Sequence, residues 1–283
     1  MLAPPKILVF DSGVGGLSVL AALRAQLPGC DFVFACDNAA FPYGTKSEAE
    51  LIARVDRVVN QLVRHFQPEL LVIACNSAST VALPRLRAQL RQPVVGVVPA
   101  IKPAAQLSAT RVIGLLGTPG TVRRQYTREL IAEFAAHCEV IPLGSAELVE
   151  IAERALRGVA PDLHQLRTIL APLFAAPALD TVVLACTHFP LLGAALAAAA
   201  PRPLRWIYSG DAIARRVASL LPGWQAAADA GFRACFTSPA DIAALYPALA
   251  ELGCTAVEVR DGDGGRHDPP AAFPAGAAHP APA

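Results

Sequence analysis

Two of the seven cysteines stand in matched surroundings that could support chemistry. The segment Glu69-Leu-Leu-Val-Ile-Ala-Cys75-Asn-Ser is echoed 111 positions later by Asp180-Thr-Val-Val-Leu-Ala-Cys186-Thr-His. In both, a buried strand is expected to end at the cysteine and a helix to follow, and the positive end of a helix dipole favours a thiolate. A lone buried cysteine is common in protein cores, so it is the repetition that indicates function. The other cysteines lack this context: Cys30, Cys36, Cys138, Cys235 and Cys254.

Two thiols that face each other across a cleft suit the inversion of a carbon stereocentre. A thiolate removes a proton from one face of the carbon while a thiol delivers a proton to the other face, and the roles exchange in the reverse direction. Two neighbouring thiolates repel each other, so one thiol must stay protonated. The cysteine pair therefore favours an amino-acid racemase.

His188 lies two residues after Cys186 and can assist proton transfer or favour the thiolate. A Cys/His pair also serves thiol-dependent hydrolases, but a hydrolase leaves Cys75 and the echoed segment unexplained. A third class is a non-catalytic protein that binds an amino acid or a protein partner. Incorporation of solvent deuterium at the α-carbon of an amino acid separates a racemase from both alternatives.

Two further segments combine polar side chains with turn-forming residues. The glycines of Phe10-Asp-Ser-Gly-Val-Gly-Gly-Leu-Ser18 do not match the Gly-x-Gly-x-x-Gly or P-loop patterns. A tight turn that places Asp11 and Ser12 near a substrate amine or a catalytic thiol fits better than a nucleotide site. In residues 37–46, backbone amides around Gly44 could hold a carboxylate, although an ordinary loop fits equally well.

Short apolar runs alternate with amphipathic segments along the chain. This alternation predicts an α/β fold built from parallel βαβ units, with functional residues just past the carboxyl ends of the strands. The expected strands are residues 6–10, 31–35, 70–74, 94–98, 111–116, 139–142 and 181–185, and the clearest helices are residues 47–66, 121–136 and 146–156. Because residues 6–13 are also weakly echoed from residue 111, we expect two similar halves with a cleft at their junction.

Composition and charge exclude several classes of protein. The net charge is +1 without a basic stripe, so no nucleic-acid partner is expected. The chain is 54% hydrophobic, yet no window has the roughly 20 uninterrupted apolar residues of a membrane span. The free thiols and the absence of a signal peptide indicate a cytoplasmic protein. Residues 261–283 are rich in Gly, Pro and Ala and are expected to be a disordered tail.

Taken together, these motifs resemble the glutamate racemase family within the aspartate/glutamate racemase superfamily. The resemblance covers residues 6 to about 260 and includes Ala74-Cys-Asn-Ser-Ala-Ser79, Leu143-Gly-Ser-Ala-Glu-Leu-Val-Glu150 and Ala185-Cys-Thr-His-Phe-Pro-Leu-Leu192. It implies two flavodoxin-like domains related by a pseudo-twofold axis, with mainly parallel sheets and the active site between them. The expected domains are residues 1–98 plus 208–260, and residues 99–207.

The resemblance also implies roles for individual residues. Cys75 and Cys186 correspond to the two catalytic acid/bases, with Asp11 assisting near Cys75 and both Glu150 and His188 assisting near Cys186. The expected substrate-binding residues are Asp11, Ser12, Tyr43, Gly44, Asn76, Ser77, Thr118, Thr187 and His188. No pyridoxal phosphate and no metal are expected, which agrees with the presence of only three lysines.

The implied activity is interconversion of L- and D-glutamate, with D-glutamate supplied to peptidoglycan. Thr187-His188 favours glutamate over aspartate, and an aspartate or other amino-acid racemase is the related alternative. Ser77 replaces the family's usual threonine, and Tyr208-Ser209-Gly210 replaces an Asp-Ser-Gly-like segment. The stretch from Leu143 resembles enterobacterial members that a peptidoglycan precursor activates. Activator dependence and a homodimer are left open by the sequence.

Overall fold

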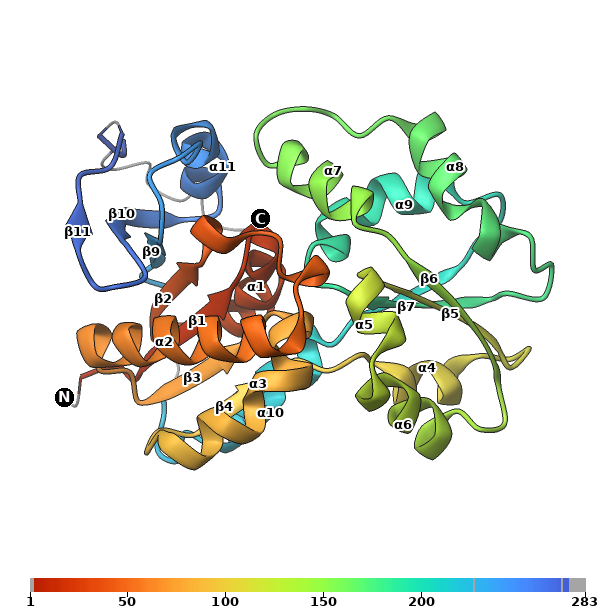
Figure 1. Ribbon diagram of the computed structural model, residues 1–283, viewed down its shortest axis with the longest axis horizontal. Helices are drawn as coiled ribbons and strands as arrows, with labels where there is room; N and C mark the ends of the chain where they lie inside the picture. Colours follow the sequence, from red (N-terminus) through yellow and green to blue (C-terminus); the bar gives the residue numbers. More distant parts are fainter. Residues whose placement is uncertain (1–2, 226, 271, 275–283) are drawn as a thin grey trace.

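The strands expected from the apolar runs form two separate β-sheets. In the computed structural model, which describes residues 3–225, 227–270 and 272–274, a seven-stranded sheet has the order β11-β10-β9-β2-β1-β3-β4 and a four-stranded sheet has the order β6-β5-β7-β8. All neighbouring strands are parallel except β10 and β11. Figure 1 shows the two sheets in two lobes side by side, which we call the first and the second lobe.

The first lobe takes its elements from both ends of the described chain. Its strands are β1 (Lys6–Asp11), β2 (Asp31–Cys36), β3 (Leu70–Ile73), β4 (Val94–Gly96), β9 (Phe232–Phe236), β10 (Cys254–Arg260) and β11 (Arg266–His267). Its α-helices are α1 (Leu17–Gln26), α2 (Glu48–Phe66), α3 (Asn76–Gln89), α10 (Gly210–Ser219) and α11 (Tyr246–Glu251). Short 3-10 turns include η1 (Val14–Gly16), η2 (Asn38–Ala40), η3 (Tyr43–Thr45) and η5 (Ala243–Leu245).

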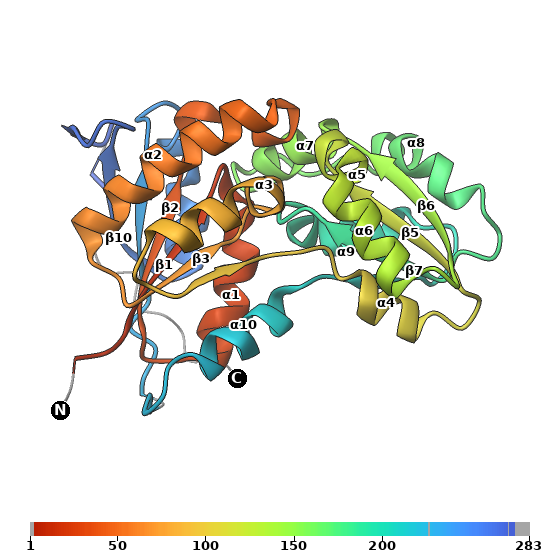
Figure 2. The same ribbon diagram turned by 60° about the horizontal axis from the view of Figure 1, so that its bottom comes forward.

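The second lobe is a continuous segment between β4 and α10. Its strands are β5 (Val112–Gly117), β6 (Glu139–Gly144), β7 (Thr181–Ala185) and β8 (Arg205–Ile207). Its helices are α4 (Ile101–Leu107), α5 (Pro119–Arg123), α6 (Gln125–Phe134), α7 (Glu147–Ala155), α8 (Leu163–Phe174) and α9 (Gly193–Ala199), with the 3-10 turn η4 (Phe189–Leu192) after β7. Because the lobe is inserted, two connections cross between the lobes (Figure 2), and Ser209 Oγ donates to the Val98 carbonyl there.

The echo in the sequence corresponds to a repeated strand order. The order β2-β1-β3-β4 in the first lobe matches β6-β5-β7-β8 in the second, so β3 and β7 are equivalent strands. Cys186 comes directly after β7, and Cys75 comes one residue after the end of β3. The fold prediction of two similar, mainly parallel α/β lobes is therefore confirmed.

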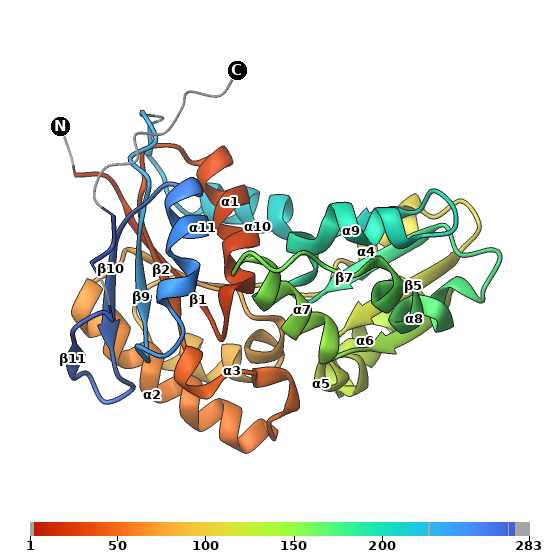
Figure 3. The same ribbon diagram turned by 90° about the horizontal axis from the view of Figure 1, so that it is seen from above.

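Alternating residues of each strand pack on opposite faces of the sheets, as expected for strands buried on both sides. In β1, Ile7 and Val9 pack with α1, α10 and α11, whereas Leu8 and Phe10 pack with α2 and α3. Figure 3 shows α1 and α11 on the opposite side of the large sheet from α2. The small sheet is likewise covered by α7, α8 and α9 on one face and by α4 and α6 on the other. None of the helices in the described ranges is long and apolar enough to cross a membrane.

Two predicted segments differ from the structure. The single helix expected over residues 121–136 is two helices, because Arg124 is extended (φ −67°, ψ 146°). Its buried guanidinium donates to the Ser77 carbonyl at 3.0 Å and to Thr80 Oγ1 at 2.9 Å on the first lobe. This contact between lobes overrides the local helix pattern.

The tail predicted to be disordered from residue 261 is ordered at its start. Asp261 accepts hydrogen bonds from the backbone of Asp263 and Gly265 at 2.9 and 2.8 Å, closing a turn that leads into β11. Phe273 packs against Tyr246 with ring centroids 5.2 Å apart. Residues 271 and 275–283 lie outside the described part.

A buried ion pair fixes the loop between β2 and α2. Asp37 is fully buried and accepts bonds from Arg54 Nε at 2.8 Å, from Arg54 Nη2 at 2.6 Å and from Tyr43 at 2.5 Å. Burial alone would raise the pKa of Asp37, but these bonds and one from Thr237 lower it. Arg54→Met leaves a buried, unpaired carboxylate, which should lower the free energy of unfolding by about 3 kcal/mol.

Urea unfolding at pH 7 measures this loss. The matched control is Arg57→Met on the same helix, because Arg57 is half-exposed and its partner Asp263 is 81% exposed. The control should unfold at nearly the wild-type urea concentration. If both variants lost the same free energy of unfolding, the ion pair between Asp37 and Arg54 would not be the cause of the loss.

Candidate active site

A small cavity lies where the carboxyl ends of the equivalent strands of the two lobes meet. Eleven of the twelve predicted site residues line it: Asp11, Ser12, Tyr43, Gly44, Cys75, Asn76, Ser77, Thr118, Cys186, Thr187 and His188. Both cysteines are 5% exposed, and the Cys75 and Cys186 side chains come from different lobes. The structure thus brings together residues that are up to 177 positions apart, each at or just past the end of a strand or at the start of a helix or 3-10 turn.

The glycine-rich turn after β1 allows the second lobe to approach closely. A Cβ atom on Gly15 would lie 2.5 Å from both His188 Nδ1 and Thr187 Oγ1, and one on Gly13 would lie 2.4 Å from Glu153 Oε1. Ser18 Oγ, in the first turn of α1, also donates to the Thr187 carbonyl at 2.8 Å. The close packing of the two lobes therefore accounts for the glycines, without a phosphate-binding role for this turn.

Cys75 is hydrogen-bonded to a carboxylate through a serine. It occupies the N-cap position of α3, and its Sγ lies 3.7 Å from Ser12 Oγ. Ser12 in turn binds Asp11 Oδ1 through its backbone N–H at 2.6 Å, while Thr187 Oγ1 donates to Asp11 Oδ2 at 2.8 Å. Burial and the negative charge of Asp11 raise the pKa of Cys75 well above its usual range, so this thiol is protonated at neutral pH.

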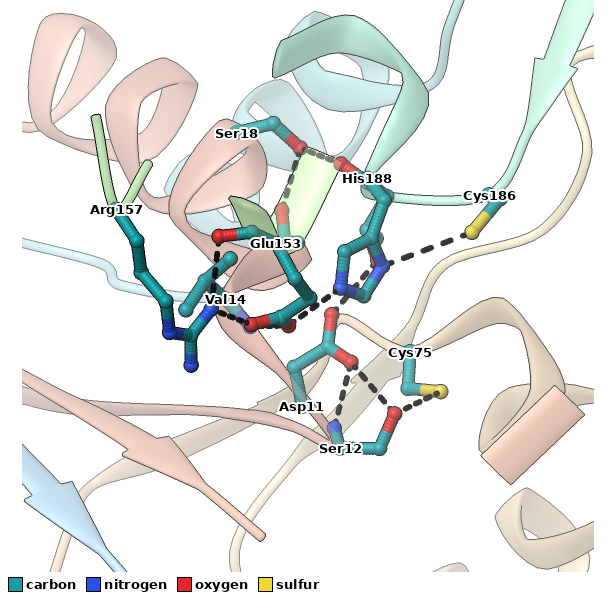
Figure 4. Close-up of polar contacts among 11 residues, drawn as sticks. Asp11, Ser12, Val14, Ser18, Cys75, Glu153, Arg157, Cys186 and His188 are labelled. Atoms are coloured by element: carbon teal, nitrogen blue, oxygen red, sulfur yellow. Dashed lines mark hydrogen bonds and ion pairs between the residues drawn. The ribbon is translucent and has the colours of Figure 1, made fainter. Parts of the chain in front are cut away.

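Cys186 is paired with an imidazole and a second carboxylate (Figure 4). His188 Nδ1 lies 3.7 Å from Cys186 Sγ, and His188 Nε2 lies 2.9 Å from Glu153 Oε1. Burial alone would lower the pKa of His188, but its bonds to Cys186 and Glu153 raise it to about 10. The pKa of Glu153 falls to about 2 in spite of burial, because His188, Arg157 and the Val14 N–H all bind its charged form. An imidazolium beside Cys186 stabilises negative charge on that sulfur.

The structure corrects the prediction for Glu150. This side chain is exposed on α7 and does not line the cavity, and the carboxylate at His188 belongs to Glu153, one helical turn later. Glu153 lies on the buried face of α7 with Val149 and Ala152. An acidic residue in register with apolar positions of an amphipathic helix was the signal that could have identified it. Other lining residues outside the predicted set include Phe41 and Val149.

Further lining residues of the cavity offer groups for a carboxylate and an amine. Asn76 and Ser77 begin α3, Thr118 caps α5, and Ser77 Oγ lies 3.3 Å from Thr118 Oγ1. The Asn76 Oδ1 atom is buried without a hydrogen-bond partner among the described residues, which makes it an available acceptor. Tyr43 donates its hydroxyl to Asp37, so it presents its ring and backbone to the cavity.

The imidazole of His188 should make stability depend on pH. Its pKa is raised from 6.5 to about 10, so between pH 6.5 and 8.5 the unfolded chain loses a proton that the folded protein keeps. The free energy of unfolding should therefore fall as pH rises, by up to about 1.4 kcal/mol per pH unit. Urea unfolding across this range measures the slope, and His188→Gln should flatten it. An equal slope in wild type and variant would contradict an imidazolium at this position.

The two matched lobes and their paired thiols place the chain among the two-lobed α/β racemases. The family model described as Asp/Glu/Hydantoin racemase matches residues 17–217, and the chain belongs to this family. A glutamate racemase of Salmonella typhimurium is 50% identical over 258 residues, covering 90% of this chain and 91% of the relative.

Solved structures of similar sequence have the same fold. The crystal structure of Escherichia coli glutamate racemase in complex with L-glutamate and the activator UDP-MurNAc-Ala is 48% identical, with a TM-score of 0.86 over 91% of this chain and 98% of that one. A glutamate racemase from Thermus thermophilus in complex with β-chloro-D-alanine is 32% identical, with a TM-score of 0.71 over 92% and 97%. The chain therefore aligns with these proteins over nearly their whole length.

Proposed function

We propose that this chain is a glutamate racemase that moves protons between substrate and the thiols of Cys75 and Cys186. The observation that carries the proposal is that equivalent strands of the two lobes, β3 and β7, each deliver one thiol to the same enclosed cavity. Each thiol has its own polar partners, Asp11 with Ser12 on one side and Glu153 with His188 on the other.

The reaction balances with these groups alone. In one direction the Cys186 thiolate takes the α-proton and becomes a thiol, while Cys75 gives its proton to the opposite face of the carbon and becomes a thiolate. In the other direction the two sulfurs exchange roles. The imidazolium of His188 stabilises the thiolate form of Cys186, and Ser12 can donate to the thiolate form of Cys75. Enclosure in a water-poor cavity strengthens both interactions.

The substrate is held by the polar walls of the cavity. Its α-carboxylate would lie near the N-terminus of α3, where Asn76 and Ser77 supply backbone N–H groups. Its ammonium group fits the carboxylate of Asp11 and the free Asn76 Oδ1, both of which are buried. Thr118 and the amides around Gly44 would receive the side-chain carboxylate, and they set the preference for glutamate over the shorter aspartate.

An assay in heavy water with no added cofactor tests this proposal. Incubation with L- or D-glutamate should produce the other enantiomer with deuterium on the α-carbon, whereas aspartate should react far more slowly. Chiral chromatography and the loss of the α-proton signal in NMR spectra measure the two events. A Cys/His hydrolase would show neither, and a protein that only binds glutamate would leave the α-proton in place.

We also propose that D-glutamate from this reaction serves peptidoglycan and that a peptidoglycan precursor activates the enzyme. The E. coli relative, 48% identical, was crystallised with the activator UDP-MurNAc-Ala. Titration with this nucleotide should raise kcat/KM for L-glutamate. An unchanged kcat/KM at saturating nucleotide would remove activation from the proposal and leave racemisation intact.

A further inference from the structure

Arg157 lies behind the cavity and contacts the carboxylate that holds His188. Its side chain is 24% exposed, follows the end of α7, and donates from Nη1 to Glu153 Oε2 at 2.6 Å. We propose that Arg157 is a positioning residue of the racemase, which holds Glu153 so that His188 faces Cys186. This inference rests on the proposed function.

The two oxygens of the Glu153 carboxylate have separate partners. Oε2 accepts from Arg157, while Oε1 accepts from the Val14 N–H at 2.8 Å and lies 2.9 Å from His188 Nε2. With Oε2 fixed by Arg157, Oε1 points toward the imidazole, and the imidazole presents Nδ1 to Cys186. Figure 4 shows Arg157, Glu153, His188 and Cys186 in this sequence. Loss of the guanidinium would leave Oε2 without this partner, and the carboxylate would then be held through Oε1 alone.

Arg157 also donates from Nη1 to the Glu153 carbonyl at 2.7 Å, near the carboxyl end of α7. A basic residue there is a common helix-capping device, which would act on stability alone. The two interpretations differ in what they predict for the reaction. A capping residue affects how much enzyme is folded, whereas a positioning residue affects the turnover and the pH dependence of the folded enzyme.

The guanidinium is accessible from a groove that is separate from the substrate cavity. Arg154 and Arg157 of the second lobe line this groove together with Asn38 and Phe236 of the first lobe. Arg157 does not line the cavity that holds the two thiols. Substitution of Arg157 should therefore leave substrate contacts intact, and a small guanidinium ion can reach the vacated position from solvent.

Several charged and titratable groups surround His188 and Arg157, the two partners of the Glu153 carboxylate. Three groups face the imidazole of His188: Glu153 on α7, Cys186 just after β7 and Asp11 at the end of β1. Arg157 faces Glu153, and its charge also reaches Cys36 at the end of β2. Without Arg157, the charged form of Glu153 is less stabilised and less well directed. The pKa of His188 should then fall from about 10, because Glu153 is one of the groups that raise it.

Arg157→Met tests the proposal, with Arg154→Met as the matched control. Arg154 lies in the last turn of α7, just before Arg157, is exposed and lines the same groove. We expect kcat of Arg157→Met to fall by about tenfold to a hundredfold, with KM for glutamate nearly unchanged. The high-pH limb of kcat should move down by about one pH unit. In Arg157→Ala, which leaves the position of the side chain vacant, millimolar ethylguanidinium should restore part of the activity, relative to an equal concentration of sodium chloride.

Three results would overturn the proposal. The first is that Arg157→Met keeps the kcat and the pH profile of the wild type. The second is that Arg157→Met and Arg154→Met lose kcat equally. The third is that the loss of kcat is fully explained by the folded fraction measured by circular dichroism. The wild-type enzyme is assayed first on L- and D-glutamate. Inactivity there would reject the proposed function itself, whereas an active wild type with an unaffected Arg157→Met rejects only the role of Arg157.

Discussion

Cys75→Ala and Cys186→Ala should each lower racemisation of glutamate by about a thousandfold or more. Each variant loses the group that donates or removes a proton on one face of the α-carbon, and acid–base groups contribute factors of about 10² to 10⁴. The remaining thiol cannot reach the opposite face because the cavity is enclosed by residues of both lobes. Circular dichroism of enantiopure L- and D-glutamate solutions during turnover measures the rate.

A second measurement separates loss of inversion from loss of folding. The thiol that remains can still remove the α-proton from one face and return a deuteron to it. Each variant should therefore exchange one enantiomer without inverting it, and the two variants should act on opposite enantiomers. Cys235→Ala is the matched control, because Cys235 is a buried thiol of β9 that does not line the cavity. Full racemisation by either cleft variant would exclude the two-thiol mechanism.

Glu153→Gln should lower kcat by about a hundredfold or more. Glutamine keeps the shape of the side chain but removes a charge that, together with Cys186, raises the pKa of His188 to about 10. A neutral imidazole stabilises the Cys186 thiolate less, so proton transfer between Cys186 and the α-carbon slows. Initial rates from both enantiomers between pH 6 and 10 measure the loss.

Glu150→Gln is the control that the helix itself provides. It makes the same change one turn earlier on α7, at an exposed position with no role in the cavity. We expect its kcat to match the wild type. If Glu150→Gln were the more damaging variant, the role assigned to Glu153 from the contacts of His188 would be wrong.

The sequence was sufficient to predict the architecture and most of the cavity. Repetition of an apolar strand, an alanine, a cysteine and two polar residues identified Cys75 and Cys186, and the equivalent strand orders explain why they meet. Residues beside a strand end are predictable in this way, because parallel strands in one sheet bring their carboxyl ends to one edge. The same reasoning covers Asp11, Thr118 and His188.

Contacts between elements distant in the chain were not predictable. Glu153 and Glu150 are both acidic residues of one amphipathic helix, and only packing against the glycine turn after β1 decides which is buried. Arg124 interrupts an otherwise helical segment because its partners lie on α3, in the other lobe. The turn at Asp261 depends on side-chain bonds to a glycine-rich segment whose composition alone indicated disorder.

The unlike surroundings of the two thiols have a thermodynamic consequence. Cys75 has a carboxylate and a serine, whereas Cys186 has a charged imidazole, so the two faces of the substrate meet different electrostatics. Enantiomers have the same free energy in water, and the equilibrium constant between them is therefore fixed at equality. Every substitution in this cleft, on either side, must change kcat/KM for L- and D-glutamate by the same factor. The asymmetry of the site can appear only in how tightly each enantiomer is held and in how fast the bound form turns over.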